Sequence, residues 1–185
     1  KNPLGSFKLI QKRERGLEYR PYHFDDMFYI STNIDESTNF KLVRTLISSP
    51  SKSNWKDVIS HRDNVLIEEV DFFKNFMVLG ERENGLLKIR IKSWDGNKDY
   101  YLGLESEFDF ENETYDASIG SNPEYDTDVL RYNYTSLTTP YSVVDHSVVT
   151  QKEEIKKQQE VLGGGFDPKN YTSERLFATA HDGKK

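Results

Sequence analysis

The chain has 185 residues, 13% of them aromatic, no cysteine, and a formal net charge of −6. The lack of cysteine excludes a disulfide framework and a cysteine nucleophile, and an acidic chain is a poor candidate for binding the nucleic-acid backbone. No apolar run approaches the ~18 residues that cross a membrane. We therefore expect neither nucleic acid nor a membrane as a partner, and the aromatic content favours β-sheet over helix.

Residues 1–64 are expected to form one strand and then a four-stranded meander. Residues 1–16 are interpreted as the last strand of a preceding unit, centred on 7–11, and 17–64 as a complete unit. Clusters of Asp, Glu and Ser separate the strands, as turns require. The strands of the complete unit are predicted at 17–22, 27–32, 39–47 and near 58–59.

Residues 65–112 repeat this plan. Asn84 and Gly85 form the strongest hairpin signal of the chain, because both residues tolerate the positive φ of a type I′ turn. Beyond the turn, apolar and charged residues alternate with the period of a strand. The four strands are predicted at 65–73, 76–83, 87–91 and 99–102.

Residues 113–165 form a third unit. Within 130–140, Leu130, Tyr132 and Tyr134 alternate with polar residues, which predicts a strand with one buried face. Residues 151–160 are rich in helix formers. They contain only one apolar residue, Ile155, so we interpret them as a polar edge strand and keep a short helix as the alternative. The strands are predicted at 115–119, 129–135, 141–149 and 153–161.

Residues 166–185 follow a glycine-rich break at 163–165 and include a predicted strand at 171–180. This strand leads to a turn at Asp182 and Gly183 with no second strand behind it, which suggests a truncated piece. The three meanders recur at about 50 residues, in the range of a β-propeller blade. The fold class is therefore all-β, a partial propeller of about three four-stranded antiparallel blades, with an antiparallel sandwich as the alternative.

Few residues suggest chemistry. There is no Gly-x-Ser-x-Gly motif, and the scattered histidines are interpreted as surface or turn residues. We nominate no catalytic, cofactor-binding or metal-binding residue, and we expect no cofactor. Alternating acids at 124–128 weakly resemble calcium ligands, and a second acidic cluster is interpreted in the same way. Two tryptophans could stack on a sugar but more often pack in the fold. These residues are His23, His61, His146, His181, Glu124, Asp126, Asp128, Asp109, Glu111, Glu113, Asp116, Trp55 and Trp94.

Three stretches carry a family resemblance. Leu-Arg-Tyr-Asn-Tyr-Thr-Ser-Leu-Thr-Thr-Pro at 130–140 is similar to the closing propeller blade of the oligopeptidase B (protease II) group of the prolyl oligopeptidase family of serine peptidases. Lys-Gln-Gln-Glu-Val-Leu-Gly-Gly-Gly-Phe-Asp-Pro at 157–168, followed by 171–183, resembles the passage from the propeller into the peptidase domain. Residues 63–68 and 81–89 resemble the penultimate blade. The sequence at 144–149 and the third glycine of 163–165 depart from the family pattern.

The resemblance implies a two-domain enzyme in which a propeller caps an α/β-hydrolase domain and restricts access to short peptides, which are cleaved after Arg or Lys. All catalytic residues would follow residue 183, so we expect this chain to be an inactive fragment. Its partners would be the C-terminal hydrolase domain and, for the whole enzyme, short basic peptides. The family implies a cytoplasmic location, with the periplasm left open.

An alternative interpretation is a free-standing all-β module that binds a protein or a glycan, motivated by the acidic loops and the two tryptophans. Three blades do not close a ring, so the fragment should expose blade faces and strand edges. We expect copies of the chain to associate through them.

Overall fold

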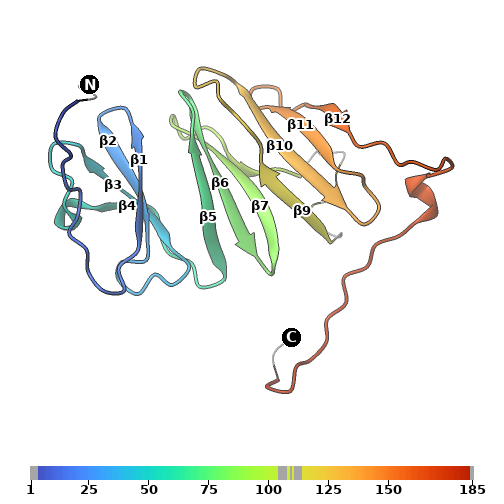
Figure 1. Cartoon of the computed structure of the whole chain (residues 1–185), viewed down its shortest axis with the longest axis horizontal. Coiled ribbons are helices and arrows are strands. Elements are labelled where there is room, and N and C mark those ends of the chain that lie inside the picture. Colours follow the sequence, from blue (N-terminus) through green and yellow to red (C-terminus); the bar gives the residue numbers. More distant parts are fainter. Residues whose placement is uncertain (1–3, 104–107, 109, 111–113, 184–185) are drawn as a thin grey trace. The chain divides into compact units, whose positions relative to one another are not determined.

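The computed structural model describes residues 4–103, 108, 110 and 114–183, and these form an all-β protein (Figure 1). Within this part of the chain the strands make three four-stranded antiparallel sheets, each built from four consecutive strands. The chain divides into two compact units, 1–67 and 68–185. No helix among the described residues is long and apolar enough to span a membrane.

The first sheet is a meander in the order β1-β2-β3-β4. Its buried positions include Ile30 and Leu42, which no solvent reaches. The turn between its first two strands is made by Asp25, whose φ of 55° is one that aspartate tolerates better than most residues. The strands are β1 (Tyr19–Phe24), β2 (Met27–Thr32), β3 (Lys41–Leu46) and β4 (Lys56–Ile59), and a short 3₁₀ helix, η1 (Lys52–Asn54), precedes β4.

The second sheet has the order β5-β6-β7-β8. Asn84 and Gly85 connect β6 to β7 with φ values of 51° and 83°, which confirms the predicted type I′ hairpin. Along β7 the buried residues alternate with partly exposed ones, because one face of the sheet is covered. The strands are β5 (Val65–Phe72), β6 (Phe76–Glu83), β7 (Leu86–Ser93) and β8 (Asp99–Tyr101).

The third sheet has the order β9-β10-β11-β12. Its last strand is the segment for which a helix was the alternative, and the strand is correct: Glu153–Gln158 pairs with β11 along the sheet edge. The polar side chains of this edge remain in solvent, which is how edge strands avoid further pairing. The strands are β9 (Tyr115–Ile119), β10 (Val129–Ser136), β11 (Ser142–Ser147) and β12 (Glu153–Gln158).

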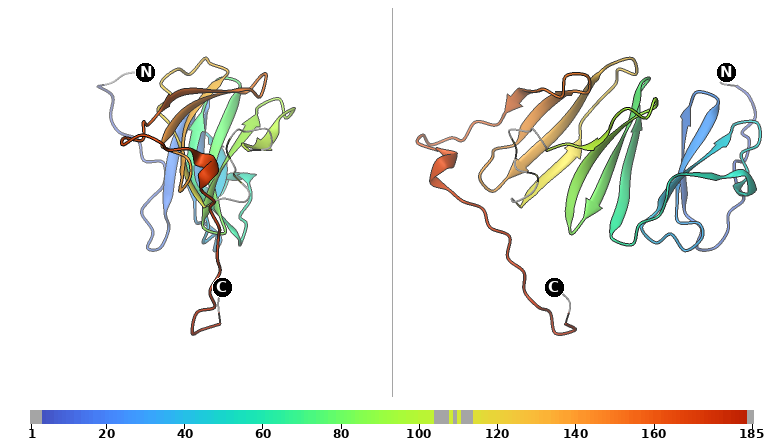
Figure 2. Two further views of the ribbon diagram at one scale, coloured as in Figure 1. Left: turned by 90° about the vertical axis from the view of Figure 1, so that its right-hand side faces the viewer. Right: turned by 180° about the vertical axis from the view of Figure 1, so that it is seen from behind.

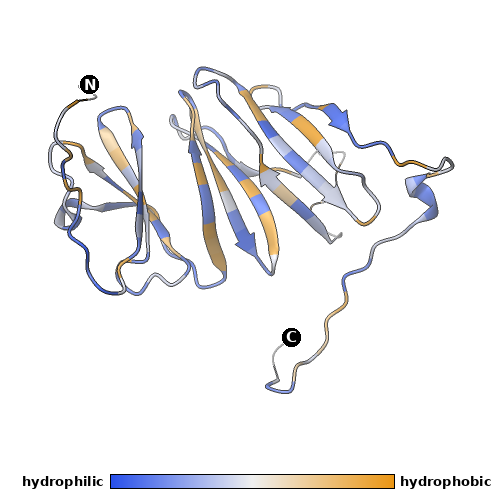
Figure 3. Ribbon diagram, in the orientation of Figure 1, coloured by the Kyte–Doolittle hydropathy of each residue, from blue (hydrophilic) through white to orange (hydrophobic). Residues whose placement is uncertain are grey.

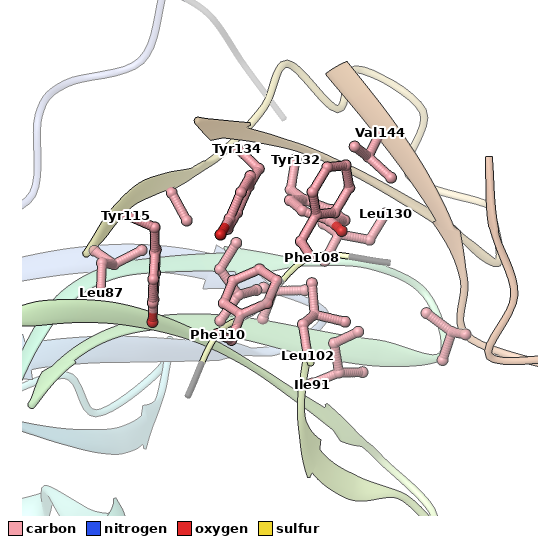
Figure 4. Packing of buried hydrophobic residues seen from close by; sticks show 14 of the residues in the cluster. Leu87, Ile91, Leu102, Phe108, Phe110, Tyr115, Leu130, Tyr132, Tyr134 and Val144 are labelled. Carbon is pink, nitrogen blue, oxygen red and sulfur yellow. The ribbon is translucent and has the colours of Figure 1, made fainter. Parts of the chain in front are cut away.

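The second and third sheets share one hydrophobic core. On β10, Leu130, Tyr132 and Tyr134 are completely buried, as their alternation predicts. Figure 3 shows this alternation of hydrophobic and hydrophilic residues along the strands. The Tyr134 ring lies 4.5 Å from the Phe108 ring and 5.1 Å from the Phe110 ring, centroid to centroid (Figure 4). Aromatic pairs at such distances add about 0.5–1.5 kcal/mol each beyond the area they bury.

Two predicted strands do not form. Residues 7–11 and 171–180 have no strand assignment, and the second segment leaves the third sheet as an extended chain that pairs with no strand (Figure 2). Their sequences have strand-like composition, but a strand exists only when a neighbour accepts its backbone hydrogen bonds. A second 3₁₀ helix, η2 (Pro168–Asn170), lies between the third sheet and 171–180, where the Asp167 carboxylate accepts a hydrogen bond from the Lys169 amide.

Replacing Tyr134 with alanine should lower the free energy of unfolding by about 3–5 kcal/mol, because the substitution leaves a cavity among aromatic rings. Urea denaturation of the purified chain measures this. Tyr141→Ala is the matched control, since that side chain is 45% exposed and should cost less than about 1 kcal/mol. Equal losses in both variants would contradict the placement of the core.

Candidate functional site

A chain of buried polar groups connects the second sheet to the third. The Tyr100 hydroxyl on β8 lies 2.9 Å from His146 Nε2 on β11. On the other side of the ring, His146 Nδ1 lies 3.6 Å from the Glu153 carboxylate of β12, which also accepts a 2.8 Å hydrogen bond from the Tyr132 hydroxyl. Burial raises the pKa of Tyr100 to about 12, so at neutral pH its hydroxyl keeps the proton that it can donate to His146.

His146 is not the surface or turn residue that the sequence analysis predicted. Its side chain is buried, because on β11 it falls on the same face as Ser142 and Val144, which point into the core. His23 and His181 are exposed, and His61 accepts a hydrogen bond from the Asn39 amide beside its own sheet. The strand period of 142–147 was the available signal, since every second residue of a half-buried strand points inward.

The second sheet holds a fully buried carboxylate, Glu81. It accepts a 2.5 Å hydrogen bond from the Tyr101 hydroxyl and lies 3.6 Å from the Arg90 guanidinium. Arg90 also makes two hydrogen bonds, of 2.6 and 2.8 Å, to the Asp99 carboxylate. The Arg90 hydrogen bond holds the pKa of Asp99 below its usual range, against the opposing effect of burial, and Lys92 adds to the lowering. The arrangement places positive charge beside each carboxylate, so it stabilises the sheet.

The acidic loop at 124–128 contacts the turn between β5 and β6 of the second sheet. Asp126 makes a 2.7 Å ion pair with Lys74, and Asp128 lies 3.5 Å from the Asn75 amide nitrogen. The Lys74 amide donates to the Tyr125 carbonyl. Oxygens that meet protein cations are poorly placed as calcium ligands, and no metal-binding cluster is found among the described residues. Asp109, Glu111 and Glu113 lie outside the described residues, Asp116 is exposed on β9, and Glu124 is exposed.

Both tryptophans pack within their own sheets. The Trp94 indole donates to the Phe73 carbonyl at 2.9 Å and stacks on Phe72, with ring centroids 6.1 Å apart. The Trp55 indole donates to the Pro50 carbonyl at 2.8 Å. Each indole thus has a packing role and a hydrogen-bond partner within its own sheet.

A cavity of about 550 Å³ lies at the β6–β7 end of the second sheet. Lys88 spans it partly, with an ion pair of 2.7 Å to Glu83, and Arg175 of the segment after the third sheet lies at its edge. Among the described residues, the lining mixes aliphatic, aromatic and charged side chains. The lining residues are Glu83, Asn84, Leu86, Lys88, Asp99, Tyr100, Tyr101, Leu102, Gly103, Phe110 and Arg175.

Comparison with known proteins identifies the family. Residues 2–159 match the profile of the prolyl oligopeptidase N-terminal β-propeller domain. The chain belongs to this family. Its sheets are thus blades of the propeller of serine peptidases, as the resemblance implied.

The relatives extend far beyond this chain. The dipeptidyl aminopeptidase BI of Pseudoxanthomonas mexicana is 40% identical over 97% of the chain, which covers 24% of that protein. Protease 2 of Moraxella lacunata is 25% identical over the full chain, which covers 25% of that protein. The chain spans about a quarter of the length of these relatives.

The fold of the chain also matches solved structures of oligopeptidase B. Oligopeptidase B of Leishmania major superposes with a TM-score of 0.83 at 28% identity, over 99% of this chain and 26% of that one. Oligopeptidase B of Trypanosoma brucei, in a closed form with covalently bound antipain, superposes with a TM-score of 0.80 at 30% identity, over 94% of this chain and 25% of that one. In the parent peptidases the propeller sits with a C-terminal hydrolase domain.

Replacing Tyr100 with phenylalanine should lower the free energy of unfolding of the propeller by about 1–2 kcal/mol, because it removes the hydroxyl that contacts buried His146 Nε2. Thermal or urea unfolding measures the loss. Tyr171→Phe is the control, as that side chain is 56% exposed. A Tyr100→Phe variant as stable as the control would show that the inter-sheet hydrogen bond contributes nothing.

Replacing Asp99 with asparagine should reduce the acid sensitivity of the fold. A carboxyl whose pKa is lowered by folding stabilises the fold above its unfolded pKa of about 3.9, and this contribution is lost as the pH falls through the lower, folded value. The variant should be less stable than the unchanged chain at pH 7, with the difference shrinking below about pH 4. Urea unfolding across pH 2–7 tests this, with the exposed Glu160→Gln as control. A difference that grows on acidification would contradict the assignment.

Proposed function

We propose that this chain is the non-catalytic propeller part of a serine peptidase of the prolyl oligopeptidase family, and that it caps an active site carried by a following α/β-hydrolase domain. The observation that best supports this proposal is that 99% of the chain superposes on oligopeptidase B of Leishmania major and covers only 26% of it. The chain has no Gly-x-Ser-x-Gly motif. A rigid wall of packed sheets beside an active site excludes folded proteins and admits peptides that fit the entrance.

The surface near the end of the third sheet supports a neighbouring domain. Leu137 follows β10, and Leu162 lies in the segment after β12; their side chains are 79% and 85% exposed. Both side chains line one pocket at this end of the sheet. Large exposed apolar side chains that lie together mark an interaction site, and the contact with a hydrolase domain would bury them.

For the whole enzyme we propose cleavage of short peptides after Arg or Lys, by likeness to oligopeptidase B. A second candidate is removal of dipeptides from a free amino terminus, which the 40% identity to a protein named dipeptidyl aminopeptidase favours. The two activities differ in whether the peptide needs a free amino terminus. With the acidic loop at 124–128 and the tryptophans used in packing, the observations that motivated a free-standing binding module have another explanation.

The test compares the chain alone with the whole protein encoded by its gene. We expect no hydrolysis by the chain and hydrolysis of an N-blocked Arg reporter peptide by the whole protein, stopped by a serine-directed reagent. Cleavage restricted to a dipeptidyl reporter with a free amino terminus would favour the second candidate. Serine-dependent hydrolysis by the pure chain, or a gene that ends without a Gly-x-Ser-x-Gly motif, would overturn the proposal.

A further inference from the structure

The segment that follows the third sheet touches the folded body through few side chains. Within 171–183 every residue is exposed except Ser173 and Arg175, which are half-buried. These two residues lie two positions apart, so in an extended chain they point to the same side. This side faces the body, and the remaining side chains of the segment point into solvent.

Arg175 makes the contact that fixes this path. Its guanidinium donates a hydrogen bond to the backbone carbonyl of Asn84, in the turn between β6 and β7. The ring of Phe177 lies 5.0 Å from the guanidinium carbon, in a cation–π arrangement. Arg175 also lies near enough to the buried Tyr115 on β9 to lower the pKa of its hydroxyl, although burial dominates and raises that pKa to about 12. The Arg175 guanidinium is thus in contact with the β6–β7 turn and with its own segment, and it acts electrostatically on β9.

The turn between β6 and β7 presents a backbone carbonyl oxygen to the Arg175 guanidinium. In a two-residue hairpin the carbonyl of the first turn residue points away from the ladder and is free to accept an outside donor. At Gly85 a Cβ atom would lie 3.4 Å from Arg175 Nη2, an ordinary van der Waals distance, so the guanidinium packs directly against the turn. Glycine is favoured at this position by its positive φ of 83°.

We propose that Arg175 anchors the inter-domain segment to the hairpin of the second sheet and so sets where the flexible link between the propeller and the hydrolase domain begins. The effect on domain opening rests on the proposed function, whereas the contact between Arg175 and Asn84 lies within this chain and can be tested by itself. With the anchor in place the free link begins at residue 176. Without it the link begins nearer the third sheet, to which the Gln159 amide is joined by a hydrogen bond to the Tyr141 carbonyl. Arg175 is a positioning residue, since it does not touch a substrate.

The consequence concerns domain opening. Hinges are short segments whose ends are held by rigid elements. Releasing Arg175 lengthens the free link, so the domains separate more readily and the entrance admits larger peptides. The reaction on a short peptide, which needs little opening, should change less.

The anchor is tested on the chain itself by the distance between two spin labels. The sequence contains no cysteine, so Glu174→Cys and Val149→Cys place one label on each exposed site, beside the anchor in the segment and on the β11–β12 turn. We expect a narrow distance distribution, a broad one with Arg175→Ala, and partial recovery of the narrow one with Arg175→Lys. Lys169→Ala, which removes an exposed cation from the same segment, should change nothing. A distribution that is broad from the start, or unchanged by Arg175→Ala, would overturn the anchor.

The consequence is tested on the whole protein. With Arg175→Ala we expect the ratio of kcat/KM on a peptide of ~30 residues to that on a short reporter to rise at least ~3-fold, while kcat/KM on the short reporter stays within ~2-fold. An unchanged ratio would overturn the role in opening. If the labels report the anchor and the whole protein has no peptidase activity, then the proposed function fails and the anchor stands.

Discussion

The packing of β10 against the second sheet is the interaction on which the larger unit depends. Tyr132 and Tyr134 are among the largest fully buried side chains of the core that the second and third sheets share. Each ring is completely buried, and each is surrounded by further aromatic rings rather than by small side chains. Large rings bridge the distance between two sheets with few residues, which suits a chain of modest hydrophobic content.

The buried carboxylates Glu81 and Glu153 near this core have polar partners. Glu81 is fully buried with Tyr101 and Arg90 beside it, and Glu153 is shared by Tyr132 and His146. An isolated charge in such positions would be prohibitively costly, so the partners are a condition of the fold. The outer contacts between the sheets, such as the Lys74–Asp126 ion pair, are exposed and contribute little stability. They align the turns of neighbouring blades instead.

The polar groups of the second and third sheets take part in contacts within and between blades. Tyr100 and His146 meet across the two sheets, whereas Glu81, Tyr101 and Arg90 meet within the second sheet. In the proposed enzyme these blades form the wall beside an attached hydrolase domain, and the contact of Arg175 with the β6–β7 turn fixes the segment that leaves them.

The sequence by itself determined the repeat, the strands of each blade and the hairpin at Asn84, because period-two burial and positive-φ turn residues are local properties. It also determined the polar edge at 153–158, since a segment with one apolar residue has no face to bury as a helix. The family resemblance at 130–140 came from sequence as well. The contact of His146 with Tyr100, the use of Asp126 as a partner of Lys74, and the absence of strands at 7–11 and 171–180 were decided only by the tertiary structure. Each depends on which distant segment lies alongside, and a strand-like sequence without a neighbour to accept its hydrogen bonds remains an extended chain.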